Sequence, residues 1–394
     1  MREGKVISAY TPTIGGVAEA VLKMSVGNGY GFDFDNNMSM TDLFGYNYGS
    51  FVLELSENME IGKTVGYVTD KKEYNYQEYS LALDSVVGAY EDKLESVYPC
   101  NIASPKDEIK TVSYKAEKRV APRVKVAKPK VLIPVFPGTN CEFDSAKAVR
   151  DAGAEPEIFV INNLTADGVK RSADTFAKKI AESQAIFVPG GFSGGDEPDG
   201  SGKFITAFFR GSDVKAAVTE LLDNRDGLMC GICNGFQALI KLGLLPYGRI
   251  MDTDADCPTL TFNDIARHQS KIVRTRIASN MSPWLSLCNV GDVYNVPISH
   301  GEGKFLASDK VLSELVAGGQ IATQYVDLDG NPTSDIRYNP TGSTFAIEGI
   351  TSPDGRVLGK MGHSERIGNG LYKNVCGEFD MKMFLSAVNY FKRS

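Results

Sequence analysis

Apolar and polar positions downstream of residue 129 follow a repeating order. Short apolar runs rich in β-branched residues end at Gly or Pro, as expected of strands that are buried on both faces. Between these runs, apolar residues recur at helical spacing. The predicted strands are 131–136, 157–161, 185–191 and 227–233, and the predicted helices are 144–153, 175–183, 213–225 and 234–245. This alternation predicts an α/β fold with a parallel sheet and right-handed crossovers.

The pattern before this region differs. Residues 6–29 indicate a strand, a Gly-containing turn and a helix, and residues 50–56 and 64–70 indicate two more strands. The first 104 residues show no titratable cluster, and their short elements favour an α+β segment that is part of a larger domain.

The stretch 105–130 is rich in Lys, Arg and Pro and has no sustained apolar periodicity. It is typical of a solvated linker or an extended surface strap. We therefore predict a segment 1–104, a linker 105–128 and a domain 129–394.

The composition of the chain argues against several classes of protein. A chain of 394 residues is long enough for two or three domains, and its net charge of −7 argues against a nucleic-acid binder. No apolar stretch reaches the roughly 18 residues needed to span a membrane, and the first residues carry no secretory signal. Seven scattered cysteines indicate free thiols in a reducing compartment, so we expect a cytoplasmic protein.

The most informative short motif is Gly231-Ile232-Cys233-Asn234-Gly235, at the change from strand to helix. It fits the strained nucleophile elbow with cysteine in the serine position. The helix N-terminus favours a thiolate there, and the next amide can donate to an oxyanion. Cys230 lies inside the strand and is expected in the sheet packing. A redox or metal CxxC pair is the alternative, but it would favour the first cysteine at the helix start, and no further ligands are evident.

Three histidines could serve as the base for such a cysteine. His268 has no neighbouring carboxylate, whereas His300 and His363 each precede a glutamate by two residues. A carboxylate at that spacing could hold the imidazole tautomer. A predicted hairpin would deliver His363 to a strand end, and the glycines around His300 suggest close approach to a substrate. These residues alone do not decide between His300 and His363.

Taken together, the motifs GICNGFQ, VPGGFSGGD, SHGEGKF and GHSER, with PGTNCEFDSAKAVRDAGAE before them, resemble a class I glutamine amidotransferase domain of flavodoxin-like α/β fold. The resemblance covers about 129–394 and is strongest to the C-terminal glutaminase domain of the large-type phosphoribosylformylglycinamidine synthases. Residues 1–104 are similar to the end of the second synthetase half of those enzymes, which has the aminoimidazole-ribonucleotide-synthetase fold.

The resemblance implies a role for each matching residue. Cys233 would be the nucleophile, His363 the base and Glu365 its orienting carboxylate. The residues implied at the oxyanion and substrate sites are Gly191, Phe192, Asn234, Gln237, His300 and Gly301, and no metal site is implied. One departure is Ser364, where many relatives have Pro between the His and the Glu.

The implied activity is hydrolysis of glutamine to supply ammonia for ATP-dependent amidation of formylglycinamide ribonucleotide in purine biosynthesis. The partners would be glutamine and the synthetase domains of the same enzyme, without nucleic acid or membrane. No cofactor is expected in this chain, whereas the complete enzyme would use ATP and magnesium. The loop 192–204, with four glycines, is expected to complete the oxyanion site when synthetase domains dock. The alternatives are a cysteine hydrolase for another amide and a catalytically silent scaffold fragment.

Overall fold

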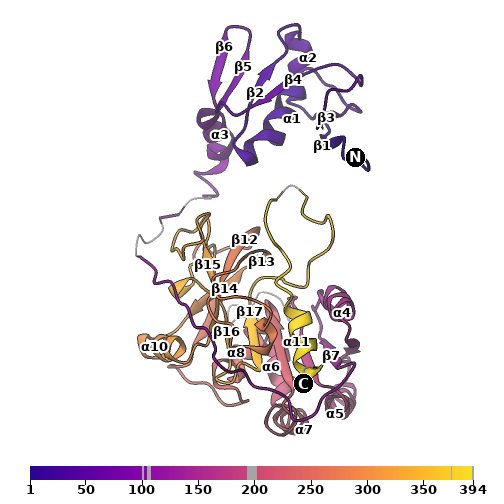
Figure 1. The fold of residues 1–394 in the computed structure, drawn as a ribbon, viewed down its shortest axis with the longest axis vertical. Helices are drawn as coiled ribbons and strands as arrows, with labels where there is room; N and C mark the ends of the chain where they lie inside the picture. The colour runs from indigo at the N-terminus through magenta and orange to yellow at the C-terminus, as the bar shows by residue number, and fades with distance from the viewer. Residues whose placement is uncertain (100–101, 104–107, 193–201, 374, 393–394) are drawn as a thin grey trace. The chain divides into compact units, whose positions relative to one another are not determined.

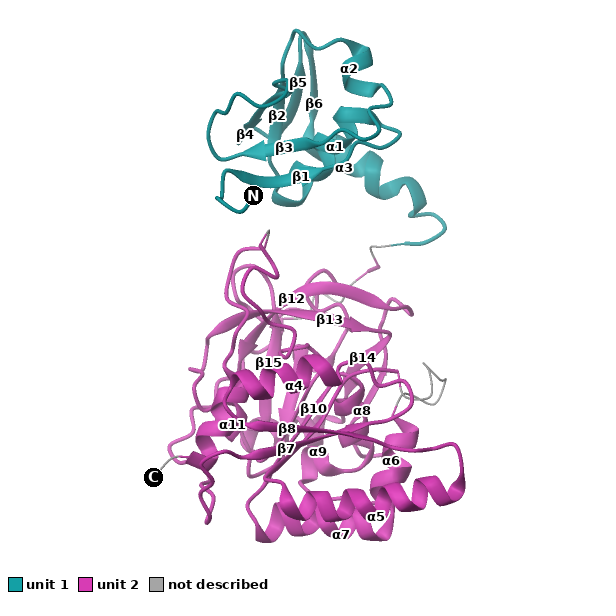
Figure 2. Cartoon of the chain, turned by 90° about the vertical axis from the view of Figure 1, so that its right-hand side faces the viewer, with its two compact units in different colours: residues 1–101 teal, residues 102–394 magenta. Residues whose placement is uncertain are grey.

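A computed structural model describes residues 1–99, 102–103, 108–192, 202–373 and 375–392. The chain divides into two compact units, Met1–Asn101 and Ile102–Ser394 (Figure 1, Figure 2). Within the described residues, none of the helices combines the length and the apolar character that crossing a membrane requires.

Unit 1 is a small α+β arrangement. Its described elements are β1 (Val6–Tyr10), α1 (Gly16–Ser25), β2 (Gly31–Phe34), α2 (Met40–Phe44), β3 (Val52–Leu55), β4 (Gly66–Thr69), β5 (Glu73–Tyr76), β6 (Tyr79–Ala82) and α3 (Leu83–Glu91). The strands form the ribbon β1-β3 and a sheet of order β4-β2-β5-β6. A small core forms where Val17 and Val21 of α1 pack with Phe32, Leu43 and Val52.

Unit 2 is built around one large sheet. Its described helices are α4 (Glu142–Asp151), α5 (Ala166–Glu182), α6 (Lys203–Arg210), α7 (Ser212–Thr219), α8 (Asn234–Lys241), α9 (Leu244–Tyr247), α10 (Asp309–Ala317) and α11 (Met383–Lys392). Its described strands are β7 (Lys130–Val135), β8 (Glu155–Val160), β9 (Ala185–Val188), β10 (Leu228–Ile232), β11 (Thr259–Phe262), β12 (Gln269–Ile277), β13 (Val293–His300), β14 (Glu302–Leu306), β15 (Ile321–Val326), β16 (Ile347–Thr351) and β17 (Val357–Lys360).

The sheet has a parallel half and an antiparallel half. Over the described residues its order is β13-β12-β15-β16-β17-β10-β9-β7-β8. The strands from β17 to β8 pair in parallel, whereas β13, β12, β15, β16 and β17 pair antiparallel in turn. The predicted parallel sheet is therefore confirmed for β7 to β10, and residues 269–351 add an antiparallel half that the sequence did not predict. The predicted hairpin before His363 is present as β16 and β17.

Helices cover the parallel half in two groups. Helix α4 contacts β7, β8 and α11, whereas α5, α6, α7 and α8 are linked by contacts to one another. Helix α5 begins at Ala166, well before the predicted residue 175, because the Thr165 side chain caps it by accepting from the Gly168 amide. Helix α8 ends at Lys241, earlier than predicted, since Gly243 after it adopts a left-handed conformation.

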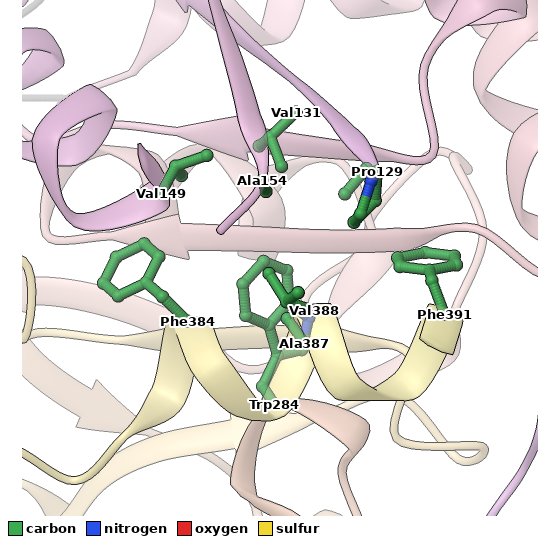
Figure 3. A pocket seen from close by; sticks show the side chains of 10 residues that line it. Pro129, Val131, Val149, Ala154, Trp284, Phe384, Ala387, Val388 and Phe391 are labelled. Carbon is green, nitrogen blue, oxygen red and sulfur yellow. The ribbon is translucent and has the colours of Figure 1, made fainter. Parts of the chain in front are cut away.

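An apolar pocket lies under α11, at the edge where the parallel strands begin (Figure 3). Val131 and Ala185 stand at the starts of β7 and β9, and Phe384 and Phe391 of α11 close the other side. Its lining residues are all apolar. It lies at the opposite edge of the sheet from the carboxyl ends of these strands, where active sites of such sheets form.

The Lys- and Arg-rich stretch before β7 runs along unit 2 from residue 108 onward. Val112 is buried, and its backbone amide and carbonyl bond the side chains of Gln324 and Arg276. Further along, Arg123 meets Asp226, and the Val126 amide donates to the Phe391 carbonyl. Residues 108–129 are thus a strap that is held to unit 2 by backbone bonds as well as by surface charges.

Candidate active site

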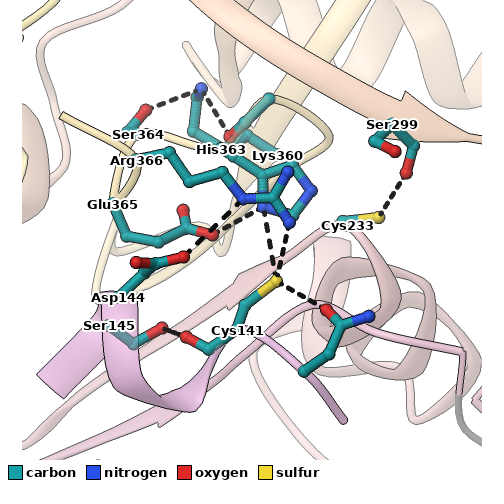
Figure 4. A network of polar contacts seen from close by, with 12 residues as sticks. Cys141, Asp144, Ser145, Cys233, Ser299, Lys360, His363, Ser364, Glu365 and Arg366 are labelled. Carbon is teal, nitrogen blue, oxygen red and sulfur yellow. Dashed lines mark hydrogen bonds and ion pairs between the residues drawn. The ribbon is translucent and has the colours of Figure 1, made fainter. Parts of the chain in front are cut away.

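Four chain segments meet at the carboxyl edge of the parallel strands. Cys233 follows β10, His363 follows β17, Gly190 follows β9, and Cys141 lies beyond β7. Gly190 lies between the other three: a Cβ built on it would be 2.7 Å from His363 Cε1, 3.3 Å from Cys141 Sγ and 3.4 Å from Cys233 Cβ. The sheet therefore brings two thiols and one imidazole around a single glycine. Figure 4 shows the side chains of Cys141, Cys233 and His363.

Cys233 occupies a strained turn. It lies between the last residue of β10 and the first residue of α8, with φ 52° and ψ −109°. A Cβ on Gly231 would come within 2.6 Å of the Gly235 backbone, and one on Gly235 within 2.0 Å of the Val188 carbonyl oxygen. Both flanking glycines are thus required by sterics, as expected of a nucleophile elbow. The position also sets the Cys233 thiol at a helix N-terminus.

Cys230 is in a different environment. It lies inside β10, is fully buried, and burial raises the pKa of its thiol well above the usual value. It is a packing residue of the sheet, as the sequence predicted.

His363 and Glu365 form a buried pair. The imidazole Nδ1 and the Glu365 carboxylate are 2.5 Å apart, and both side chains are almost fully enclosed. Burial by itself lowers the pKa of His363. The Glu365 carboxylate and the side chains of Cys141 and Cys233 outweigh burial and raise this pKa well above its ordinary value. Burial likewise favours a neutral Glu365, but His363 lowers the carboxyl pKa overall. The pair can therefore hold a proton on the imidazole beside a thiol.

The second thiol, Cys141, was not among the residues singled out from the sequence. Its Sγ lies 3.9 Å from His363 Nδ1, accepts from Arg366 Nη2 at 3.0 Å and donates to Asn140 Oδ1 at 3.0 Å. Its place after the PGTN turn of the first predicted strand is the signal that could have identified it. Cys141, His363 and Glu365 form the one group of potential metal ligands among the described residues. The Arg366 guanidinium against Cys141 disfavours a cation there.

Two backbone amides belong to turns at this edge. Asn234 is the first residue of α8 and directly follows Cys233. Gly191, in the turn after β9, forms an isolated bridge with Thr139 and has φ 156°. The Phe192 amide donates to the Gly138 carbonyl within this bridge, so it serves the turn. The second hydrogen bond of the bridge runs from the Asn140 amide to the Gly190 carbonyl oxygen. Neither of these two bonds uses the Gly191 amide.

Gln237 and His300 line the antiparallel side. The Gln237 amide is engaged at both ends, because it donates to the Glu302 carbonyl oxygen at 2.6 Å and accepts from Asn234 Nδ2 at 3.0 Å. His300 is buried, and neither ring nitrogen has a hydrogen-bond partner among the described residues. Burial, with smaller effects of His363 and His268, lowers the pKa of His300 to about 3, so this imidazole is neutral.

His300 and Gly301 precede β14, and Cys233 Sγ lies 3.8 Å from the carbonyl oxygen of the neighbouring Ser299. The strand that ends at His300 therefore borders the elbow. Of the glycine-rich loop 192–204 that was expected to complete the oxyanion site, residues 193–201 lie outside the described residues.

The chain is similar to several known proteins. Residues 128–391 match the family model of the CobB/CobQ-like glutamine amidotransferase domain. Phosphoribosylformylglycinamidine synthase subunit PurQ of Methanococcus maripaludis is 34% identical over 262 residues, which are 66% of this chain and 89% of that protein. The protein of the same name from Salinibacter ruber is 30% identical over 65% of this chain and 95% of its own length.

Among solved structures, one described as the structure of PurLQS from Thermotoga maritima is 26% identical. The match covers 67% of this chain and all of that one, with a TM-score of 0.47. The family model covers the whole of the described site, from Cys141 to Glu365. The chain belongs to the CobB/CobQ-like glutamine amidotransferase family.

Proposed function

We propose that unit 2 hydrolyses glutamine by a Cys233–His363–Glu365 triad and that the released ammonia serves phosphoribosylformylglycinamidine synthesis. The main support is the elbow: a cysteine at positive φ, at a helix start, beside a buried His–Glu pair. The reaction that uses the ammonia is inferred from two similar proteins, which are both named phosphoribosylformylglycinamidine synthase subunit PurQ.

The reaction runs through a thioester. The Cys233 thiol passes its proton to His363 Nε2, and Sγ attacks the side-chain amide carbon of glutamine. The carbonyl oxygen becomes an oxyanion held by the amides of Asn234 and Gly191. His363 gives its proton to the amide nitrogen, and the C–N bond breaks to release ammonia. His363 then takes a proton from water, which attacks the thioester and frees glutamate and the thiol. Glu365 holds Nδ1 throughout, so Nε2 serves both proton transfers.

Cys141 is the competing nucleophile because it also lies beside His363. Its Sγ approaches Nδ1, the nitrogen that already contacts Glu365, and its lone pairs face the Arg366 guanidinium. These contacts favour a supporting role for Cys141. His363 Nε2, which has no hydrogen-bond partner among the described residues, is left for Cys233.

The test compares three serine variants. Cys233→Ser should abolish glutamate release, Cys230→Ser should leave most of it, and Cys141→Ser should retain measurable turnover. Labelling with a glutamine-mimicking diazoketone, read by peptide mass spectrometry, should modify Cys233 in the wild-type chain. Labelling of Cys141 instead, or loss of activity in Cys141→Ser with Cys233→Ser active, would overturn the assignment. Turnover of other amides at equal rates would favour a general cysteine hydrolase, and no labelling would favour a silent scaffold.

Unit 1, in this proposal, is the end of a synthetase half whose remainder carries the ATP, magnesium and formylglycinamide ribonucleotide sites. More than half of the exposed large hydrophobic side chains among the described residues lie in the first hundred residues. Tyr46 and Tyr48 stack with their rings 5.9 Å apart and are 74% and 67% exposed, and the edge strand β6 exposes Tyr79 and Leu81. Apolar exposure on this scale is typical of a surface that a partner covers.

The synthetase portion of a related enzyme, produced separately, should bind the full chain, and a Tyr46→Ser/Tyr48→Ser variant should bind it more weakly. Equal affinities of the two chains by calorimetry would argue against this surface.

A further inference from the structure

A buried lysine lies directly behind the candidate triad. Lys360 is the last residue of β17, and Glu348 lies on the neighbouring strand β16; both are fully buried. The Lys360 Nζ is 3.1 Å from Glu348 Oε1, 3.1 Å from the Gly362 carbonyl oxygen and 3.0 Å from Ser364 Oγ. The ammonium group has three N–H donors, and these contacts supply three acceptors.

These contacts enclose His363 from both sides. Gly362 and Ser364 are its two neighbours in the chain, and the Lys360 side chain bonds both (Figure 4). Glu348 adds a second bond, because its Oε1 accepts from the Gly362 amide at 2.6 Å. The backbone that carries the imidazole is thus tied on each side of His363 to one buried ion pair.

Lys360 also reaches the nucleophile. Its backbone carbonyl oxygen accepts from the Cys233 amide at 2.9 Å. The same residue therefore anchors the elbow through its main chain and the His363 turn through its side chain. One residue is thus bonded to both segments that carry the proposed nucleophile and base.

Stability alone does not account for a charge pair at this place. Buried ion pairs cost desolvation and are often replaceable by apolar residues without loss of stability. A bond at Ser364 has a specific use, because Ser364 lies between the two members of the His363–Glu365 pair. The Lys360–Ser364 hydrogen bond restrains this residue and therefore the turn that carries both side chains.

We propose that Lys360, neutralised by Glu348, is a positioning residue that holds His363 in line with Cys233. This inference rests on the proposed glutaminase function and adds a positioning residue to the proposed triad. Lys360 touches neither substrate nor reacting atoms; it acts through the turn Gly362–Ser364.

The decisive variant is Lys360→Met/Glu348→Gln, which removes both charges together and keeps an acceptor for the Gly362 amide. We expect kcat for glutamine hydrolysis to fall on the order of 10–100-fold, because small misplacements of catalytic groups cost rates of this size. The matched control is Lys179→Met/Glu157→Gln, which makes the same changes at an ion pair on α5 and β8 and should keep wild-type kcat.

A simple structural role would behave differently. Activity would then follow the thermal unfolding midpoint in every variant. Ser364→Ala keeps the ion pair and is expected to fold. It should lower kcat several-fold and weaken the dependence of kcat on pH that the titration of His363 causes. Wild-type kcat in both the double variant and Ser364→Ala would overturn the positioning role while leaving the glutaminase function intact. A wild-type chain without glutaminase activity would instead overturn the proposed function.

Discussion

Replacing Gly190 by alanine should impair catalysis without unfolding the protein. A Cβ there would lie 2.7 Å from His363 Cε1, whereas carbon atoms in contact prefer about 3.5–4.0 Å. Gly190 does not adopt positive φ, so alanine brings no backbone strain. The imidazole ring, being the movable neighbour, must shift by roughly 1 Å, and its bond to Glu365 must lengthen or rotate with it.

A displacement of about 1 Å costs on the order of 10²-fold in rate, which corresponds to about 2.7 kcal/mol in the activation free energy. Gly190→Ala should therefore lower kcat for glutamate release about a hundredfold, with a smaller change in KM. The control is Gly368→Ala, where the nearest atom to the added Cβ is 4.0 Å away and no positive φ is involved.

The measurement is steady-state glutamate production at saturating glutamine, alongside thermal unfolding of each variant. Wild-type kcat in a Gly190→Ala chain that melts at the wild-type temperature would refute the reasoning, because the ring would then not need its present place. A loss of activity that follows a large loss of stability would show that the methyl group is accommodated by the sheet instead.

Further predictions concern the histidines, the elbow and the synthetase reaction. His363→Ala should lower turnover by at least ~10³-fold, whereas His300→Ala should act mainly on KM; the reverse pattern would exchange their roles. The pKa of His363 is raised above 6.5, so its contribution to the stability of the fold is present below pH 6.5 and is lost as the pH rises through the folded-state pKa. The pKa of Glu365 is lowered below 4.5, so its contribution is present above pH 4.5 and is lost as the pH falls through the folded-state pKa. The difference in unfolding free energy between wild type and Glu365→Gln should thus be largest between pH 4.5 and 6.5 in denaturant titrations, and a difference that keeps growing above neutrality would contradict the pairing. Gly235→Ala should destabilise unit 2 by about 1–3 kcal/mol in the same assay, since the added methyl meets backbone; an unchanged midpoint would speak against the tight elbow. The chain alone should form no amidine product from formylglycinamide ribonucleotide, ATP, magnesium and glutamine, as followed by chromatography; product would contradict the view that unit 1 is only part of a synthetase half.

The sequence predicted the parallel half of unit 2 well because each element there carries its own local signal. The runs before Gly190 and Cys233 are apolar on both faces, and the glycines around Cys233 indicate a turn without any knowledge of the rest of the chain. The antiparallel half carries weaker signals. Buried and half-buried positions alternate only in the second half of β12, from Val273 to Ile277, and its partners β13 and β15 are recognised only once the sheet is assembled.

The contacts of Cys141 and Lys360 could not be obtained in the same way. Cys141 meets His363 and Arg366 across more than two hundred residues, a distance over which spacing carries no information. Lys360 at the end of an apolar strand would ordinarily be placed in solvent, and its burial depends on Glu348 across the hairpin. Local patterns report a residue's own backbone, whereas these pairings depend on how separate segments converge.

The backbone of Cys233 also limits how this enzyme could evolve. A side chain branched at Cβ is strongly disfavoured at φ 52°, so threonine is a poor replacement even though it is a nucleophile in other hydrolases. Serine fits the same turn, so a hydroxyl could occupy the elbow without a change in the backbone, although the Cys233→Ser chain itself should be inactive. A change to a branched nucleophile would require the strand-to-helix turn, with its two close-fitting glycines, to be rebuilt first.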